Sequence, residues 1–94
     1  MFVVTLKFAQ NKALAKQYME AHNDWLKQGF DDDVFLLAGS IKPGVGGYLL
    51  ASESSIDTLQ ARINDAPFVA EGVVSAEIME IAVNKADQRL AFLS

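Results

Sequence analysis

Apolar segments along the chain predict four β-strands. The first, residues 2–8 (FVVTLKF), is rich in β-branched and aromatic residues. Further apolar runs cover residues 34–41, 48–52 and 73–83, and turn-forming or polar residues separate them. The second and third runs are joined by KPGVGG (42–47), whose proline and three glycines predict the turn of a hairpin.

Apolar residues at helical spacing predict helices between and after these strands. In residues 12–28 the apolar positions recur at intervals of three and four, so this segment is expected to be an amphipathic helix that Gly29 ends. A second helix is expected over residues 55–64, before Pro67 disfavours helical backbone. A short C-terminal helix is expected over residues 84–93.

The resulting order, β-α-β-β-α-β, is typical of an α+β ferredoxin-like fold, with a four-stranded antiparallel sheet and two helices on one face. We expect one such domain over residues 1–94. Two helices cover only one face of a sheet, yet the strands are apolar on both faces: Val3 alternates with Val4, and Met79 with Ile78. An apolar face does not stay exposed on a soluble monomer, so a homodimer packed sheet to sheet is expected.

Charge and composition exclude several classes of function. The net charge of −4 argues against binding to nucleic acid or to anionic membranes. No apolar run approaches the roughly 20 residues of a membrane span, and no signal peptide is recognisable. The chain has no cysteine and one histidine, so a metal site is not expected, and nothing requires a cofactor. We expect a cytoplasmic protein.

His22, in EAHNDWL, is the main candidate for catalysis because its ordinary pKa suits a general acid or base near neutral pH. The more common use of an inward histidine on a helix is structural, as a buried side chain with one hydrogen bond. Asp65 lies at a helix-to-loop break, where a carboxylate can orient a histidine, although a cap or Asx-turn is the commoner use.

Several motifs together resemble the YciI-like (YCII-related) family over almost the full length of the chain. They are EAHNDWL, LLAGSI, KPGVGGYLLA and NDAPFVAEGVV, followed by the strand SAEIMEI. The resemblance implies a dimeric α/β barrel, similar in fold to muconolactone isomerase, with a histidine–aspartate pair in a cleft. The histidine corresponds to His22. The family's acid usually precedes the proline directly, where this chain has Ala66, and Asp65 lies one residue earlier.

Two functional hypotheses follow. In the first, the protein is a small lyase- or isomerase-type enzyme in which His22 moves a proton on a small cyclic substrate and Asp65 orients the imidazole. One branch of the family dehydrochlorinates a chlorinated hydroquinone. The residues expected to contact the substrate are Tyr18, Trp25, Gly46, Gly47, Pro67 and Phe68. In the second hypothesis, the protein is a non-catalytic module for small-molecule binding or assembly, and His22 is structural.

Overall fold

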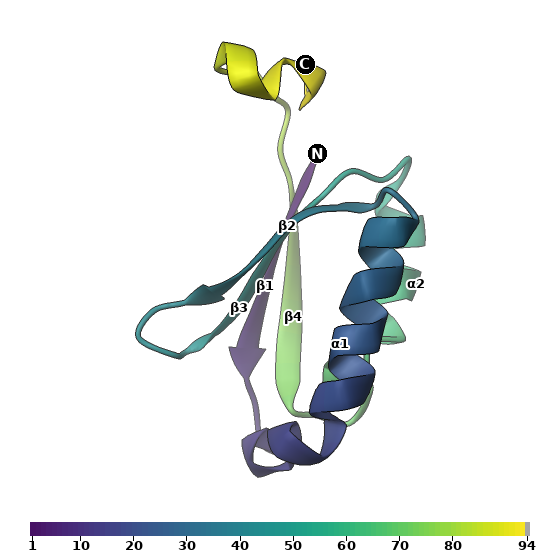
Figure 1. Ribbon diagram of the computed structural model, residues 1–94, viewed down its shortest axis with the longest axis vertical. Coiled ribbons are helices and arrows are strands. Elements are labelled where there is room, and N and C mark those ends of the chain that lie inside the picture. Colours follow the sequence, from purple (N-terminus) through teal and green to yellow (C-terminus); the bar gives the residue numbers. More distant parts are fainter. Residues whose placement is uncertain (94) are drawn as a thin grey trace.

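The computed structural model describes residues 1–93 and contains one four-stranded sheet with helices packed against it (Figure 1). In chain order the elements are β1 (Phe2–Phe8), the 3₁₀ turn η1 (Lys12–Leu14), α1 (Ala15–Asp31), β2 (Phe35–Ile41), β3 (Gly46–Ala51), α2 (Ile56–Asn64), α3 (Pro67–Ala70), β4 (Val74–Glu80) and the 3₁₀ segment η2 (Gln88–Leu93).

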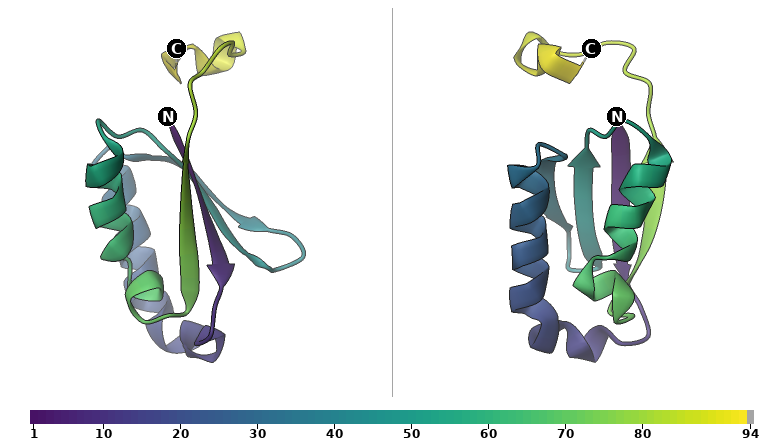
Figure 2. Two further views of the ribbon diagram at one scale, coloured as in Figure 1. Left: turned by 180° about the vertical axis from the view of Figure 1, so that it is seen from behind. Right: turned by 90° about the vertical axis from the view of Figure 1, so that its right-hand side faces the viewer.

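The sheet is antiparallel throughout, with strand order β2-β3-β1-β4. Both long helices lie on the same face of this sheet, and the views from behind and from the side agree (Figure 2). The element order and topology confirm the predicted α+β ferredoxin-like arrangement. Within residues 1–93, neither long helix covers the opposite face of the sheet (Figure 2), and Leu37 and Met79 are exposed on it.

The core lies between the sheet and the two long helices. Alternation along β1 directs Phe2, Val4 and Leu6 toward the helices, and each is at least 95% buried. A register shift between Phe35 and Leu37 inserts one extra residue into β2. Because of this bulge, both Phe35 and Ala38 face the helical side, although they are three residues apart.

Helix α1 runs to Asp31, beyond the predicted stop at Gly29, so that predicted boundary is wrong. Gly29 is a buried helical residue, and the ring of Phe35 occupies the space where its Cβ would lie. The glycine is therefore needed for close helix-to-strand packing. The chain instead reverses at Asp33, a non-glycine residue with φ of 60°.

The second helix begins as predicted, with Ser55 as its N-cap: the Ser55 hydroxyl accepts a hydrogen bond from the backbone N–H of Thr58 at 3.2 Å. Pro67 ends the helical segment, as expected, but then occupies the first turn of the additional short helix α3, where its missing N–H costs nothing. Helix α3 places Phe68 in the core beside α1.

The last strand ends at Glu80, earlier than the predicted residue 83. Beyond it, the chain leaves the body of the molecule and ends in η2, a 3₁₀ segment that begins at Gln88 where a helix from residue 84 was expected. All three ribbon views show η2 standing clear of the sheet (Figures 1 and 2). We call residues 83–93 the C-terminal arm.

Candidate functional site

A pocket of about 370 Å³ lies between α1 and the helix-facing side of the sheet. It exists because small side chains, Ala38, Ser40 and Gly47, stand on the sheet where a larger residue would reach α1. We call it the His22 pocket. Its lining residues are Leu6, Phe8, Met19, His22, Asn23, Leu26, Ala38, Gly39, Ser40, Gly46, Gly47, Phe68 and Val74.

The imidazole of His22 is held by an aromatic stack. Its ring lies 4.1 Å from that of Phe68, centroid to centroid, with the two planes 3° apart. Trp25, one turn further along α1, lies at 6.2 Å from the imidazole. Since Phe68 is buried and anchored by α3, the stack fixes the plane of the imidazole while leaving its edge to the pocket.

The protonation state of His22 follows from its surroundings. Burial lowers the pKa of His22 below its ordinary value of 6.5. Its Nδ1 atom is buried and has no hydrogen-bond partner among residues 1–93. A buried polar atom without a partner costs free energy, and beside a pocket it is a candidate for a hydrogen bond to a bound molecule. A neutral imidazole with a free ring nitrogen can accept a proton near pH 7.

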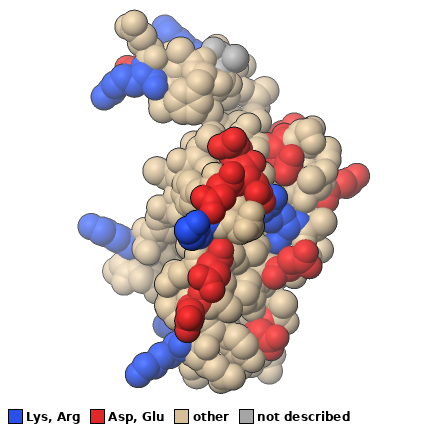
Figure 3. Space-filling view, turned by 45° about the vertical axis from the view of Figure 1, so that its right-hand side comes forward, with Lys and Arg blue, Asp and Glu red and all other residues tan. Residues whose placement is uncertain are grey.

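The remaining lining of the His22 pocket is apolar or uncharged. Asn23 and Ser40 add an amide and a hydroxyl, and no Lys, Arg, Asp or Glu belongs to the lining. Acidic side chains instead cover the outer surface of the helices (Figure 3), where Glu20, Asp24 and Asp57 are exposed. The pocket therefore offers hydrogen bonds and apolar contact, with no full charge to pair with an ionic ligand.

The predicted substrate contacts divide into two groups. Gly46, Gly47 and Phe68 line the same pocket as His22. Tyr18 and Pro67 do not line it, and the hydroxyl of Tyr18 is engaged with Glu71, whose charge raises the pKa of Tyr18.

Trp25 also lies outside the His22 pocket and has a packing role. Its ring lies 5.0 Å from that of Phe35. Its Nε1 donates a hydrogen bond to the carbonyl oxygen of Arg62 at 3.2 Å, which ties α1 to α2. A half-buried tryptophan requires apolar packing for its ring and a hydrogen-bond acceptor for its N–H, and these two contacts supply both.

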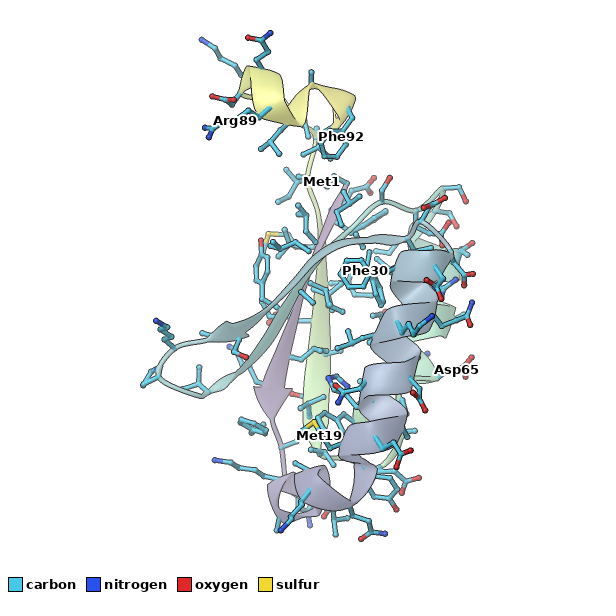
Figure 4. The ribbon with its side chains drawn as sticks, viewed as in Figure 1. Met1, Met19, Phe30, Asp65, Arg89 and Phe92 are labelled. Carbon is cyan, nitrogen blue, oxygen red and sulfur yellow. The ribbon has the colours of Figure 1, made fainter. Side chains whose placement is uncertain are left out.

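Asp65 is not brought to His22. It lines a separate hollow of about 310 Å³ together with Trp25, Thr58, Ala61 and Arg62, which we call the Asp65 hollow. Asp65 lies on the outer side of the helical layer, whereas Met19, of the His22 pocket, points toward the sheet (Figure 4). Among residues 1–93, no hydrogen bond joins the side chains of His22 and Asp65, and the two line different hollows.

Position 66, unlike Asp65, is buried and lies at the start of helix α3. Ala66 is 1% exposed and is the residue from which α3 starts, two positions before Phe68. An acid at this position would be buried on the element that carries the stacking partner of His22. At this position the chain has a methyl group, and the Nδ1 atom of His22 has no hydrogen-bond partner among residues 1–93.

Reasoning from the sequence missed Met19, Asn23 and Ser40 as pocket residues. Asn23 follows His22 directly, and a polar residue in an amphipathic helix is ordinarily expected on the solvent side. A signal for Ser40 did exist: LLAGSI and KPGVGG flank the same predicted hairpin turn, and in the sheet Ser40 lies opposite Gly47. Small residues on both neighbouring strands predict a gap in the packing above them.

Two general properties complete the description of residues 1–93. Within this range, no three His, Asp or Glu side chains gather in a group that could hold a metal ion. Across the same residues, none of the helices has the length and apolar character needed to cross a bilayer.

Comparison with known proteins identifies the family. One solved structure that aligns with the chain is 5-chloro-2-hydroxyhydroquinone dehydrochlorinase (TftG) from Burkholderia phenoliruptrix AC1100, in complex with 2,5-dihydroxybenzoquinone. The TM-score is 0.71 at 14% identity, and the alignment covers 87% of this chain and 94% of that chain, which shows a shared fold. No curated protein matches the chain. The model of the YCII-related domain matches residues 1–82, and the chain therefore belongs to the YCII-related domain family.

Proposed function

We propose that the protein is a small enzyme of lyase or isomerase type in which His22 takes a proton from a cyclic substrate bound in the His22 pocket. The observation that carries this proposal is the imidazole of His22, stacked on Phe68, with a buried Nδ1 that lacks a partner among residues 1–93. An imidazole whose pKa is lowered by burial stays available as a base at neutral pH.

The lining of the pocket supports a neutral, hydroxylated ring as the substrate class. Apolar walls such as Leu6 and Leu26 favour a flat hydrocarbon framework, while Asn23 and Ser40 offer hydrogen bonds to hydroxyl or carbonyl groups. A carboxylate or phosphate ester would enter a pocket without a cationic side chain and would lose its hydration without compensation. Small phenols, hydroquinones and lactones satisfy these conditions.

A dehydrochlorination illustrates the chemistry that such a site can perform. The ring first tautomerises: one hydroxyl becomes a carbonyl as it loses its proton, and the carbon that bears chlorine gains a proton. His22 then accepts the proton of a second hydroxyl, the C–Cl bond breaks, and chloride leaves with the bonding electrons. The ring electrons rearrange to a quinone, so the net loss is HCl and no oxidant is required. The structural neighbour, whose name describes a dehydrochlorinase, supports testing this reaction first. Asp65 has no part in this proposal, because it lines the other hollow.

The test is a reaction screen with His22→Gln as the matched variant. Chlorinated hydroxyhydroquinones and small lactones would be incubated with the protein, and chloride release, quinone absorbance and lactone isomerisation would be followed. We expect turnover of at least one compound and a loss of about 10²- to 10⁴-fold in kcat for His22→Gln. Turnover that is unchanged in His22→Gln would contradict the assignment of His22 as the base.

The second candidate is a non-catalytic binding module that uses the same pocket. Ala66 favours it, because the position from which a carboxylate could orient His22 holds a methyl group. Under this alternative, compounds of the same class bind and are recovered unchanged, and His22→Gln lowers affinity alone. If compounds of the screen bind and none is converted, the protein is a binding module and not an enzyme for these compounds.

The proposal includes a homodimer formed through the helix-free face of the sheet and a cytoplasmic location. Four apolar side chains form a continuous row across this face: Val3 pairs in register with both Leu50 and Met79, and Leu37 pairs with Leu50. Leu37 is 52% exposed and Met79 is 63% exposed in the single chain. A second copy seated on this row would bury it. Light scattering at micromolar concentration tests the dimer, and a monomer would contradict it.

A further inference from the structure

The C-terminal arm is unusual for the end of a small domain because it exposes large apolar side chains away from the core. Phe92 is 68% exposed and Leu90 is 46% exposed. Two of the three charged side chains of the arm pair with each other, since the guanidinium of Arg89 donates to the carboxylate of Asp87 at 2.9 Å. What the arm offers to a partner is therefore mainly its apolar surface.

The arm lies outside the part of the chain that the family model matches. The family model ends at residue 82, just before the arm begins. The arm also accounts for the elongated outline of the molecule, which measures 40 Å in its longest dimension and 19 Å in its shortest. Figure 4 shows Phe92 and Arg89 at the end of the molecule opposite Met19, so the arm does not approach its own His22 pocket.

The exposed surface of the chain is larger than a monomer of its mass requires. The accessible surface is 6244 Å². A folded monomer of 10.2 kDa is expected to expose roughly 5,300 Å². The single chain thus exposes about 900 Å² more than a compact monomer of its mass.

The outer row on the sheet, Val3, Leu37, Leu50 and Met79, lies at the same end of the molecule as the arm. Val3 is next to the start of β1, and Met79 is next to the end of β4, from which the chain continues toward the arm. The backbone N–H of Ile81 still bonds the carbonyl of Met1 at 2.8 Å, so the arm departs from the edge of this row.

We propose that the C-terminal arm is an intersubunit clasp: Leu90 and Phe92 of one copy pack against the Val3–Met79 end of the outer row of a second copy, while the two sheets cover the rest of that row. This inference rests on the proposed homodimer and is independent of the chemistry in the His22 pocket. A second copy on the helix-free face brings its own sheet to the place where the arm leaves the first copy. The clasp buries apolar surface from both chains and uses the excess area of the single chain.

The direct test uses a mixed dimer of the full-length protein. Because the chain has no cysteine, Gln88→Cys provides one attachment site for a nitroxide on the arm. Gln88→Cys chains without ¹⁵N that carry the nitroxide would be mixed with ¹⁵N-labelled wild-type chains. The broadening of the amide signals of the wild-type chains would then be measured. We expect broadening at Val3, Leu50 and Met79 of the wild-type chains. The same nitroxide on Asp57→Cys, an exposed position of α2, should leave these amides sharp.

The dimer dissociation constant of arm variants tests the clasp without a nitroxide label. Leu90→Ser combined with Phe92→Ser should raise the dimer dissociation constant by about tenfold or more. Ile56→Ser, which changes an apolar side chain 44% exposed at the start of α2, should leave that constant unchanged. Circular dichroism would show that both variants fold.

The outcomes separate the clasp from the dimer itself. Cross-chain broadening together with a weakened Leu90→Ser/Phe92→Ser dimer supports the clasp. A dimer without cross-chain broadening, or with an unchanged dissociation constant, overturns the clasp and leaves the dimer standing. A monomer at all concentrations overturns both, and the reaction screen on the His22 pocket then remains a separate question.

Discussion

The phenyl ring of Phe68 and the imidazole of His22 lie parallel, 4.1 Å apart, although the two residues belong to different helices. This stack excludes water from one face of the imidazole and is one source of the burial that lowers its pKa. Phe68→Leu should keep the core filled at a cost below about 1.5 kcal/mol, whereas Phe68→Ala should cost about 3–5 kcal/mol. In Phe68→Ala we expect the pKa of His22 to rise toward 6.5, measured by NMR titration; a pKa that falls further would contradict the account.

The lowered pKa of His22 also predicts how stability depends on pH. Below pH 6.5 the unfolded chain binds a proton at His22 that the folded chain does not yet bind, so protonation favours unfolding. The free energy of unfolding should therefore fall as the pH decreases from 7 through the range between 6.5 and the lower pKa of the folded protein. Urea titrations across pH 5–7.5 measure this slope.

The matched control for the pH effect is His22→Gln, because the chain has no other histidine. Carboxylates titrate mainly below this window, so the variant should show a much flatter dependence between pH 7 and pH 5.5. An equal slope in the wild type and in His22→Gln would mean that other groups cause it.

Substitutions at Ala66 test whether a carboxylate at this position can interact with the imidazole of His22. Ala66→Asp should place a carboxylate beside the buried edge of His22 and raise its pKa, because a nearby negative charge favours the imidazolium. Ala66→Asn supplies the same shape without the charge and should have a much smaller effect. Asp65→Asn should leave the pKa of His22 unchanged, since Asp65 lines the other hollow. If Asp65→Asn changes the pKa of His22 as much as Ala66→Asp does, the predicted pairing of His22 with Asp65 would be supported instead.

Gly46 and Gly47 are adjacent, but their substitutions should act in different ways. A Cβ on Gly47 meets its nearest neighbours at 3.6–3.9 Å, which is ordinary contact, so Gly47→Ala and Gly47→Val should narrow the pocket and weaken ligand binding in that order. Gly46 has φ of 157°, and a Cβ there would collide with the carbonyl of Leu6. Gly46→Ala should therefore destabilise the fold by about 1–3 kcal/mol. Thermal unfolding and ligand titration of the three variants separate the two effects.

The fold was predictable because each signal in the sequence is local. Alternation in FVVTLKF, helical spacing around His22 and the break at Pro67 each fix one element, and their order leaves few topologies. The prediction was wrong at Gly29. A glycine often ends a helix because its backbone is flexible, but here it lies inside the helix because it leaves room for the ring of Phe35. Only the position of Phe35 decides between these uses, and Phe35 comes from another element.

The candidate site was predictable only in part, for the same reason. His22 was identified by its chemistry, and Gly46 and Gly47 by their motif, and all three share a pocket. Whether Asp65 or position 66 faces His22 depends on the direction of one turn after α2, which the composition of NDAPF does not determine. Ser40 required the cross-strand register with Gly47, which is a property of the sheet and not of either segment alone.

The central claim is that the His22 pocket binds a neutral hydroxylated ring next to a neutral imidazole. An NMR titration of the full-length protein with 2,5-dihydroxybenzoquinone and with hydroquinone, followed at the His22 ring and at the amides of Ser40 and Gly47, tests it most directly. We predict saturable shifts at these three residues that Gly47→Val greatly reduces. Shifts confined to Thr58, Ala61 and Arg62 of the Asp65 hollow, or no shift at millimolar ligand, would contradict the claim.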